Sequence, residues 1–275
     1  LFFVLSGWLL GCQLFKEMDS GTIQVKRFWY RRWLRTLPAY YAVLGFTIFQ
    51  QFLTKENPEL YWDYFVFLQN YNYPLEIFYV SWSLAVEEQF YLMIAPLAAG
   101  MLYLEKNQRL LLLALLLFTP SFFRELNWYS YYNETHVRFD GCVMGVMLAL
   151  LRYQFAEIWH FLIKISGALF IISLIAFFLF FWQRWYPNDY IGEPGFLTRA
   201  FMFGCWVIFA NKSDFIKTKL SFPGARYIAT RSYSMYLLHP DAIAITNKLA
   251  KDVNFYFYFS FLNICSFYVN KDKTK

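Results

Sequence analysis

The sequence predicts an all-α, polytopic helical membrane protein, and its composition is the first observation that predicts this class. Of the 275 residues, 59% are hydrophobic and only 16% are charged, whereas soluble domains carry about 25% charged residues. A water-soluble fold of this length could not hide so much apolar surface. The net charge of +6 does not indicate a nucleic-acid partner, because the basic residues lie between apolar segments and not on a basic domain.

Nine apolar segments predict about nine transmembrane helices in a single domain that covers residues 1–275. They are residues 1–15, 37–53, 82–104, 110–123, 137–151, 161–182, 196–210, 232–249 and 255–269. Several are shorter than the ~20 residues that usually cross a bilayer, so we expect their aromatic flanks to extend them. Pro120 is expected to kink or stop the fourth segment. The four cysteines lie singly in apolar segments without metal-ligand or disulfide spacing, so no metal site is predicted.

The placement of lysine and arginine predicts the orientation in the membrane. If residues 16–36 are cytoplasmic and the segments alternate, the inner loops and the C-terminal tail carry 17 of the 25 basic residues, and the outer loops carry 4. This bias follows the positive-inside rule. We therefore expect an integral, multi-pass protein whose C-terminus is cytoplasmic.

A basic and aromatic stretch at residues 26–41, KRFWYRRWLRTLPAYY, separates the first two apolar segments. On a helix at about 100° per residue, its arginines share one arc and its tryptophans and Tyr30 fill the other. Pro38 is predicted to close this helix. A helix of this kind lies in a membrane interface. Its arginines, which would face lipid headgroups or another phosphorylated cytoplasmic molecule, are Arg27, Arg31, Arg32 and Arg35.

Ionisable residues inside predicted spans are candidate functional residues, because each costs about 2.5–3.5 kcal/mol on insertion scales. In SWSLAVEEQFYL, residues 81–92, Glu87 and Glu88 lie about two helical turns inside the third span, after Ser81 and Ser83. Adjacent carboxylates disfavour double ionisation in a low dielectric. The pair fits proton handling or the orientation of a sugar or a catalytic base, and it also fits hydrogen bonds that lock helices together.

Two further polar positions lie in predicted spans. In RFDG, residues 138–141, Arg138 and Asp140 cannot face each other on a helix, so we expect Arg138 to pair with one of the two glutamates. That pair would be structural or would form the floor of a pocket. His239 lies two turns inside the eighth span and fits either a helix-packing hydrogen bond or a functional role.

Five motifs occur along the chain in a fixed order: LFFVLSGWLLG at 1–11, FWYRRWLRTLPAYY at 28–41, SWSLAVEEQFYL at 81–92, RFDG at 138–141 and SYSMYLLHP at 232–240. In this order they resemble the acyltransferase 3 family of integral membrane O-acyltransferases, which modify O-antigen, peptidoglycan and exopolysaccharides. The resemblance implies a bacterial inner or plasma membrane. It also implies transfer of an acyl group, acetyl by family analogy, from cytoplasmic acyl-CoA to a hydroxyl of a cell-surface carbohydrate.

The resemblance also assigns roles to the candidate residues. The cytoplasmic arginines Arg31, Arg32 and Arg35 would hold the CoA phosphates, for which planar guanidinium groups are well suited. Acyl-CoA would be a co-substrate, with no bound cofactor. Glu87 and Glu88 would support catalysis. The residues assigned to the acceptor site or to structure are Ser81, Ser83, Arg138, Asp140 and His239.

The sequence departs from the family at its start. The family's catalytic histidine belongs to a first transmembrane helix that precedes the segment at residues 1–15, so we expect an N-terminally truncated chain that is inactive as it stands. Two other classes stay open. One is a proton-coupled transporter that works without acyl-CoA, and the other is a non-catalytic membrane subunit whose arginines bind anionic lipid. The sequence does not indicate an oligomeric state.

Overall fold

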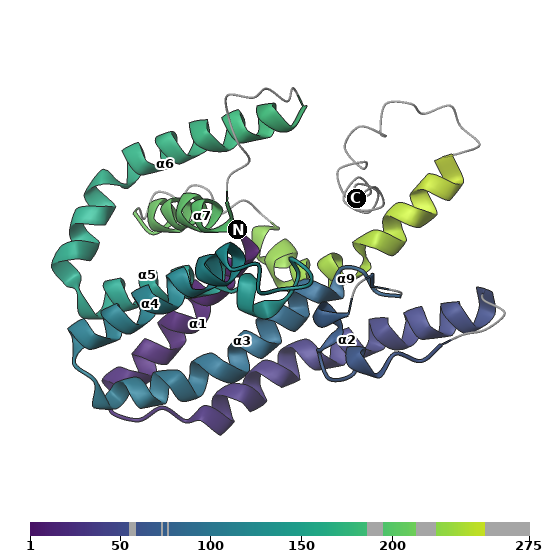
Figure 1. The fold of residues 1–275 in the computed structure, drawn as a ribbon, viewed down its shortest axis with the longest axis horizontal. Coiled ribbons are helices and arrows are strands. Elements are labelled where there is room, and N and C mark those ends of the chain that lie inside the picture. Colours follow the sequence, from purple (N-terminus) through teal and green to yellow (C-terminus); the bar gives the residue numbers. More distant parts are fainter. Residues whose placement is uncertain (55–58, 73, 76, 186–194, 213–223, 251–275) are drawn as a thin grey trace. The chain divides into compact units, whose positions relative to one another are not determined.

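The computed structural model describes residues 1–54, 59–72, 74–75, 77–185, 195–212 and 224–250. These residues form helices and connecting turns without any strand, which confirms the predicted all-α class (Figure 1). The chain divides into an N-terminal unit, residues 1–226, and a C-terminal unit, residues 227–275. Each unit is described by itself. The ninth predicted segment, residues 255–269, lies outside the described residues.

Each of the first eight predicted segments overlaps one long helix. In the N-terminal unit these are α1 (Phe2–Asp19), α2 (Val25–Thr54), α3 (Ser81–Gly100), α4 (Lys106–Glu125), α5 (Asp140–Gln154), α6 (Ala156–Trp185) and α7 (Phe196–Ala210). Four short 3-10 turns lie between them: η1 (Trp62–Tyr64), η2 (Gln69–Tyr71), η3 (Met101–Tyr103) and η4 (Thr135–Val137). The C-terminal unit holds nearly all of α9 (Ala225–Ala250).

Within the described ranges, one helix is long and apolar enough to cross a membrane by length and composition. It is the Ala156–Trp182 part of α6, and α7 is apolar but shorter. The prediction of nine transmembrane helices is therefore not confirmed on these criteria. The other helices carry more polar groups: α3 contains Glu87 and Glu88, and α1 ends with Lys16, Glu17 and Asp19.

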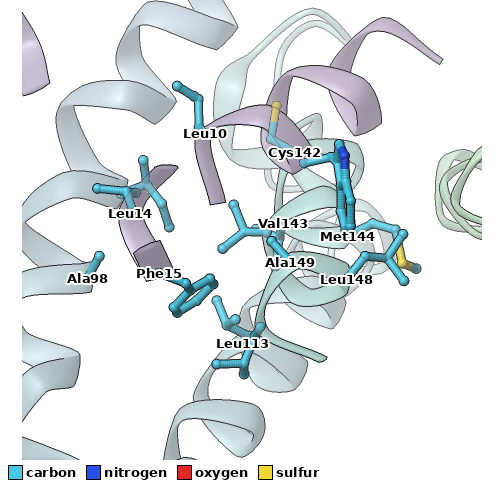
Figure 2. Close-up of a cluster of buried hydrophobic side chains, with 14 of the residues drawn as sticks. Leu10, Leu14, Phe15, Ala98, Leu113, Cys142, Val143, Met144, Leu148 and Ala149 are labelled. Carbon is cyan, nitrogen blue, oxygen red and sulfur yellow. The ribbon is translucent and has the colours of Figure 1, made fainter. Parts of the chain in front are cut away.

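The core of the N-terminal unit is built around the contact between α1 and α5. Glycines let the two backbones approach closely, as small residues do between membrane helices. A methyl group added at Gly7 would lie 1.9 Å from the carbonyl oxygen of Cys142, and one added at Gly145 would lie 2.2 Å from that of Val4. Figure 2 shows apolar side chains of α1 meeting those of α5, with Leu113 of α4 beside them.

Helix α2 corrects one prediction, because it runs from Val25 to Thr54 with Pro38 inside it. An interior proline removes a helical hydrogen bond and disfavours the helix. Tertiary hydrogen bonds compensate after it: the Tyr40 hydroxyl donates to the carbonyl of Tyr64, and the Tyr41 hydroxyl donates to that of Phe65, both at 2.8 Å. The basic stretch and the second apolar segment are thus one helix. Helix α4 likewise continues through Pro120.

Local signals explain where α4 begins. The Glu105 side chain accepts from a backbone N–H of the first turn, and the Gln108 side chain accepts from the backbone N–H of Glu105 at 3.0 Å, which together form a capping box. The guanidinium of Arg109 donates to the carbonyl of Met101 at 2.8 Å. These bonds fix the sharp turn between α3 and α4.

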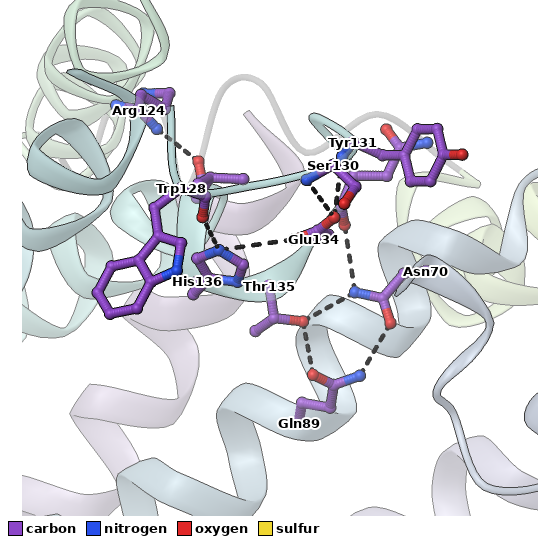
Figure 3. Close-up of polar contacts among 11 residues, drawn as sticks. Asn70, Gln89, Arg124, Trp128, Ser130, Tyr131, Glu134, Thr135 and His136 are labelled. Atoms are coloured by element: carbon purple, nitrogen blue, oxygen red, sulfur yellow. Dashed lines mark hydrogen bonds and ion pairs between the residues drawn. The ribbon is translucent and has the colours of Figure 1, made fainter. Parts of the chain in front are cut away.

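A ring of polar side chains fixes the predicted outer loops to α3 (Figure 3). The Asn70 amide donates to the Thr135 hydroxyl at 2.9 Å, the Thr135 hydroxyl donates to the Gln89 amide oxygen at 2.6 Å, and the Gln89 amide donates to Asn70 at 2.9 Å. Each group is thereby satisfied away from water. The ring joins η2, α3 and η4, and so fixes the loop between α4 and α5.

Candidate functional site

The three arginines that the sequence singled out line one pocket. Its volume is about 570 Å³, and it lies between the C-terminal half of α1 and the start of α2. The lining residues are Gln13, Lys16, Glu17, Ser20, Phe28, Arg31, Arg32 and Arg35. Lys16 adds a fourth cation to the pocket. It lies in the same predicted inner loop as the arginines but outside their motif, so the motif does not predict its role. The pocket therefore presents a concentration of positive charge suited to an anionic ligand.

Arg32 turns from this pocket into the protein, contrary to the predicted arrangement in which all the arginines face outward. Its Nη2 donates to the Tyr91 hydroxyl at 2.7 Å. The start of α2 is held against α3 on the same side, because the indole N–H of Trp29 donates to the carbonyl of Tyr91 at 3.2 Å. The side of the stretch that was predicted to face lipid is only partly exposed: Tyr30 is 63% and Leu34 is 59% exposed, whereas Trp29 lies against α3.

The Tyr91 hydroxyl is the centre of a buried hydrogen-bond network. It donates to Oε2 of Glu87 at 2.7 Å and lies 2.5 Å from the hydroxyl of Ser6 on α1. Because its single proton goes to the carboxylate, Tyr91 accepts from both Arg32 and Ser6. Three helices thus meet at one phenol: α2 through Arg32, α1 through Ser6, and α3 through Glu87 and Tyr91 itself.

Glu88 lies beside this network on the next helical position. Its Oε1 accepts from the Thr36 hydroxyl at 2.9 Å. Both glutamates are buried, with 4% of Glu87 and 6% of Glu88 exposed. Among the residues that the structure describes, Oε1 of Glu87 and Oε2 of Glu88 have no hydrogen-bond partner. Buried acceptors are rarely left unpaired, so these two oxygens are candidate contacts for a further group.

Arg138 and Asp140 contact different groups in the structure. Asp140 forms an ion pair with Arg124 at 3.1 Å. The guanidinium of Arg138 lies over the ring of Phe196 at 3.9 Å and over that of Trp82 at 5.0 Å, a cation–π arrangement. A cation that the sequence analysis did not pair with the glutamates lies beside them: the phenol of Tyr91 connects Arg32 to Glu87.

The remaining candidates make local hydrogen bonds. The hydroxyls of Ser81 and Ser83 donate to the carbonyls of Phe78 and Val80, three residues before each, at the start of α3. In the C-terminal unit, Nδ1 of His239 lies 2.6 Å from the carbonyl of Tyr236 within α9. These contacts fit the structural alternative for all three residues. Groups of three or more metal-ligating side chains are absent from the part of the chain that the structure describes.

Comparison with curated proteins finds bacterial relatives named for O-acetylation. The chain is 27% identical over 311 residues to a candidate O-acetyltransferase of Staphylococcus aureus (strain COL), covering 96% of this chain and 48% of that protein. It is 27% identical over 288 residues to the peptidoglycan O-acetyltransferase OatA of Listeria monocytogenes serovar 1/2a (strain ATCC BAA-679 / EGD-e), covering 90% and 45%. The chain thus spans about half the length of the curated relatives it matches.

The family comparison covers nearly the whole chain. No solved structure matches the sequence. The model of the acyltransferase 3 family, described as an acyltransferase domain, matches residues 1–269. That stretch contains all five motifs and both the arginine pocket and the buried carboxylates. The chain therefore belongs to the acyltransferase 3 family.

Proposed function

We propose that the full-length protein is a multi-pass membrane O-acetyltransferase that transfers an acetyl group from cytoplasmic acyl-CoA to a hydroxyl of a cell-envelope carbohydrate. Family membership and relatives named as O-acetyltransferases support the reaction class. The name of the Listeria relative makes peptidoglycan the first acceptor to test. The excess of lysine and arginine in the predicted inner loops supports a cytoplasmic arginine pocket and a cytoplasmic C-terminus.

The observation that carries this proposal is the double role of Arg32. It lines the pocket with Arg31, Arg35 and Lys16, and its Nη2 also binds the phenol that holds Glu87. Guanidinium groups bind phosphate oxygens in a planar, bidentate geometry. The pocket would hold the phosphates of the acyl donor, and Arg32 would connect the bound donor to the buried carboxylates.

The chemistry needs a base, because the acceptor hydroxyl must lose its proton as its oxygen attacks the thioester carbonyl. The new C–O ester bond forms, the C–S bond breaks, and the CoA thiolate leaves and takes up a proton. In this proposal Glu87 and Glu88 orient either the acceptor hydroxyl or the base that deprotonates it. Their unpaired oxygens, Oε1 and Oε2 respectively, are the atoms available for that contact.

The test measures acetyl transfer from radiolabelled acetyl-CoA to purified peptidoglycan fragments by the full-length protein in nanodiscs. Arg35→Ala removes one pocket cation without touching the Tyr91 network. Loss of a charge-assisted hydrogen bond of about 1.5–3 kcal/mol should raise the KM for acetyl-CoA about tenfold or more. The matched control is Arg27→Ala, an exposed arginine of the same helix outside the pocket, which should change KM less than about twofold.

Two results would refute the proposal. If Arg35→Ala and Arg27→Ala change KM and protein yield equally, the arginines act as membrane anchors and do not form a binding site for the acyl donor. Proton-coupled flux of a solute by a protein that neither binds nor consumes acetyl-CoA would instead favour the transporter.

A further inference from the structure

A second pocket lies in the loop between α4 and α5, apart from the arginine pocket. Its volume is about 610 Å³. In the orientation that the basic residues predict, this loop is on the outer side of the membrane. The lining residues are Phe123, Asn127, Trp128, Tyr129, Ser130, Glu134 and His136. None of the side chains in this lining is a lysine or an arginine.

The pocket has a supported aromatic wall. Trp128 is 68% exposed, yet its indole packs edge-on against the ring of Phe123 with the ring centroids 5.5 Å apart. Phe123 in turn packs edge-on against His136 at 5.3 Å, and Tyr71 stacks on His136 at 6.1 Å. The indole is therefore held from one side while most of its surface remains available for a ligand.

Polar groups line the same pocket, and Figure 3 shows the contacts of two of them, Glu134 and His136. Oε1 of Glu134 accepts from the backbone N–H groups of Ser130 and Tyr131, at 2.9 and 2.8 Å. Nε2 of His136 lies 2.8 Å from the Trp128 carbonyl and 3.5 Å from Oε2 of Glu134. Because both neighbours accept, Nε2 carries the hydrogen, and Nδ1 is the remaining polar atom of the ring.

Tyr129 and Asn127 complete the polar side. Burial and a hydrogen bond with Tyr132 raise the pKa of Tyr129 to about 12. Its phenol, which is neutral at physiological pH in any case, can both donate and accept a hydrogen bond. Asn127 adopts φ 51°, a left-handed conformation that asparagine tolerates better than most residues. It turns the chain directly before the exposed indole.

We propose that this pocket is a saccharide-binding subsite that holds one pyranose ring of the acceptor glycan. A pyranose presents an apolar C–H face, which packs on an indole, and a rim of hydroxyls that need both donors and acceptors. The pocket offers the indole of Trp128 together with a carboxylate, an imidazole, an amide and hydroxyls. Since no lysine or arginine lines it, a phosphate-containing ligand fits it less well. This inference rests on the proposed function for the identity of the glycan.

The experiment uses the full chain in nanodiscs and a soluble β-1,4-linked tetramer of N-acetylglucosamine, without any acyl-CoA. Binding is followed by isothermal titration and by saturation-transfer NMR. Trp128→Ala should weaken binding about tenfold or more, as expected for the loss of one aromatic anchor. Trp128→Phe should retain most of the affinity. The matched control is Trp62→Ala, which removes another exposed tryptophan of a predicted outer loop, 70% exposed and outside the pocket.

Each outcome decides the proposal. Tight binding by the wild type that Trp128→Ala loses and Trp62→Ala keeps would support it. Equal binding by all variants, or no binding by the wild type, would overturn it. Titrating acetyl-CoA into the same samples tests the proposed function separately, and a circular dichroism spectrum like that of the wild type shows that Trp128→Ala is folded. If the tetramer binds through Trp128 while acetyl-CoA does not bind at all, the subsite stands and the acetyltransferase proposal fails.

Discussion

Replacing Gly7 with alanine tests whether the close approach of α1 and α5 is required for stability. The added methyl group would lie 1.9 Å from the carbonyl oxygen of Cys142 and 2.8 Å from its carbon. Both atoms belong to the backbone of α5, so no side chain can rotate away. Relief of the contact requires the two helices to separate by about 1 Å. Overpacking of this kind costs about 1–3 kcal/mol, and we expect the upper end.

The matched control is Gly45→Ala in α2, where nothing lies within 4 Å of the added methyl group. Alanine is favoured over glycine inside a helix by about 1 kcal/mol, and this gain applies to both variants. It therefore cancels in the comparison. The Gly7→Ala protein should be less stable than the Gly45→Ala protein by about 3 kcal/mol, the overpacking cost alone.

The measurement is the free energy of unfolding in mild detergent, from denaturant titration of both variants and the wild type. Stabilities that agree within about 0.5 kcal/mol, the usual spread for surface substitutions, would refute the close contact. The double variant Gly7→Ala, Gly145→Ala gives a second test. One separation of the helices relieves both clashes, so its cost should be less than the sum of the two single costs.

Three further predictions concern the hydrogen bonds. Tyr91→Phe leaves Arg32, Glu87 and Ser6 without their shared hydroxyl and should lower the unfolding free energy by about 2–4 kcal/mol. The control is Tyr103→Phe at a 91% exposed position, which should not change the unfolding free energy measurably. Arg124→Ala leaves the buried carboxylate of Asp140 without its ion-pair partner and should lower the unfolding free energy by about 3–5 kcal/mol. Adding Asp140→Asn to this variant should restore part of the lost stability. If the stability losses of the two single variants simply add in the double variant, the pairing is contradicted. Gln108→Ala opens the capping box of α4 and should lower the thermal midpoint slightly, by the equivalent of about 0.5–1 kcal/mol, with no change in acetyl-CoA binding.

Much of the helical layout follows from the sequence, because the predicted membrane setting requires each apolar run to form a hydrogen-bonded helix. Seven of the nine predicted segments overlap long helices of the N-terminal unit, and α7 has the predicted bounds of 196–210. The end predicted at Pro38 was wrong, because a local signal at the proline was outweighed by tertiary hydrogen bonds from Tyr40 and Tyr41. Proline preferences describe an isolated helix, and α2 is not isolated.

The candidate site could be predicted in part. Helical periodicity places Arg31, Arg32 and Arg35 on one arc, and the structure brings all three to one pocket. Periodicity could not show that Arg32 bends inward, because its partner Tyr91 is 59 residues away in sequence. The pocket around Trp128 could not be predicted for a similar reason. Its only sequence signal is a loop dense in aromatic residues with one glutamate and one histidine, and that composition does not specify a geometry.

Helix α6 has a consequence for how the protein responds to its lipid surroundings. Its apolar stretch of 27 residues rises about 40 Å, whereas the hydrocarbon layer is about 30 Å thick. With α6 in the proposed transmembrane position, the excess length would be taken up by a tilt of the helix or by a local thickening of the lipid. Because α7 packs along α6, both helices would lean together, and a thinner bilayer would increase their lean.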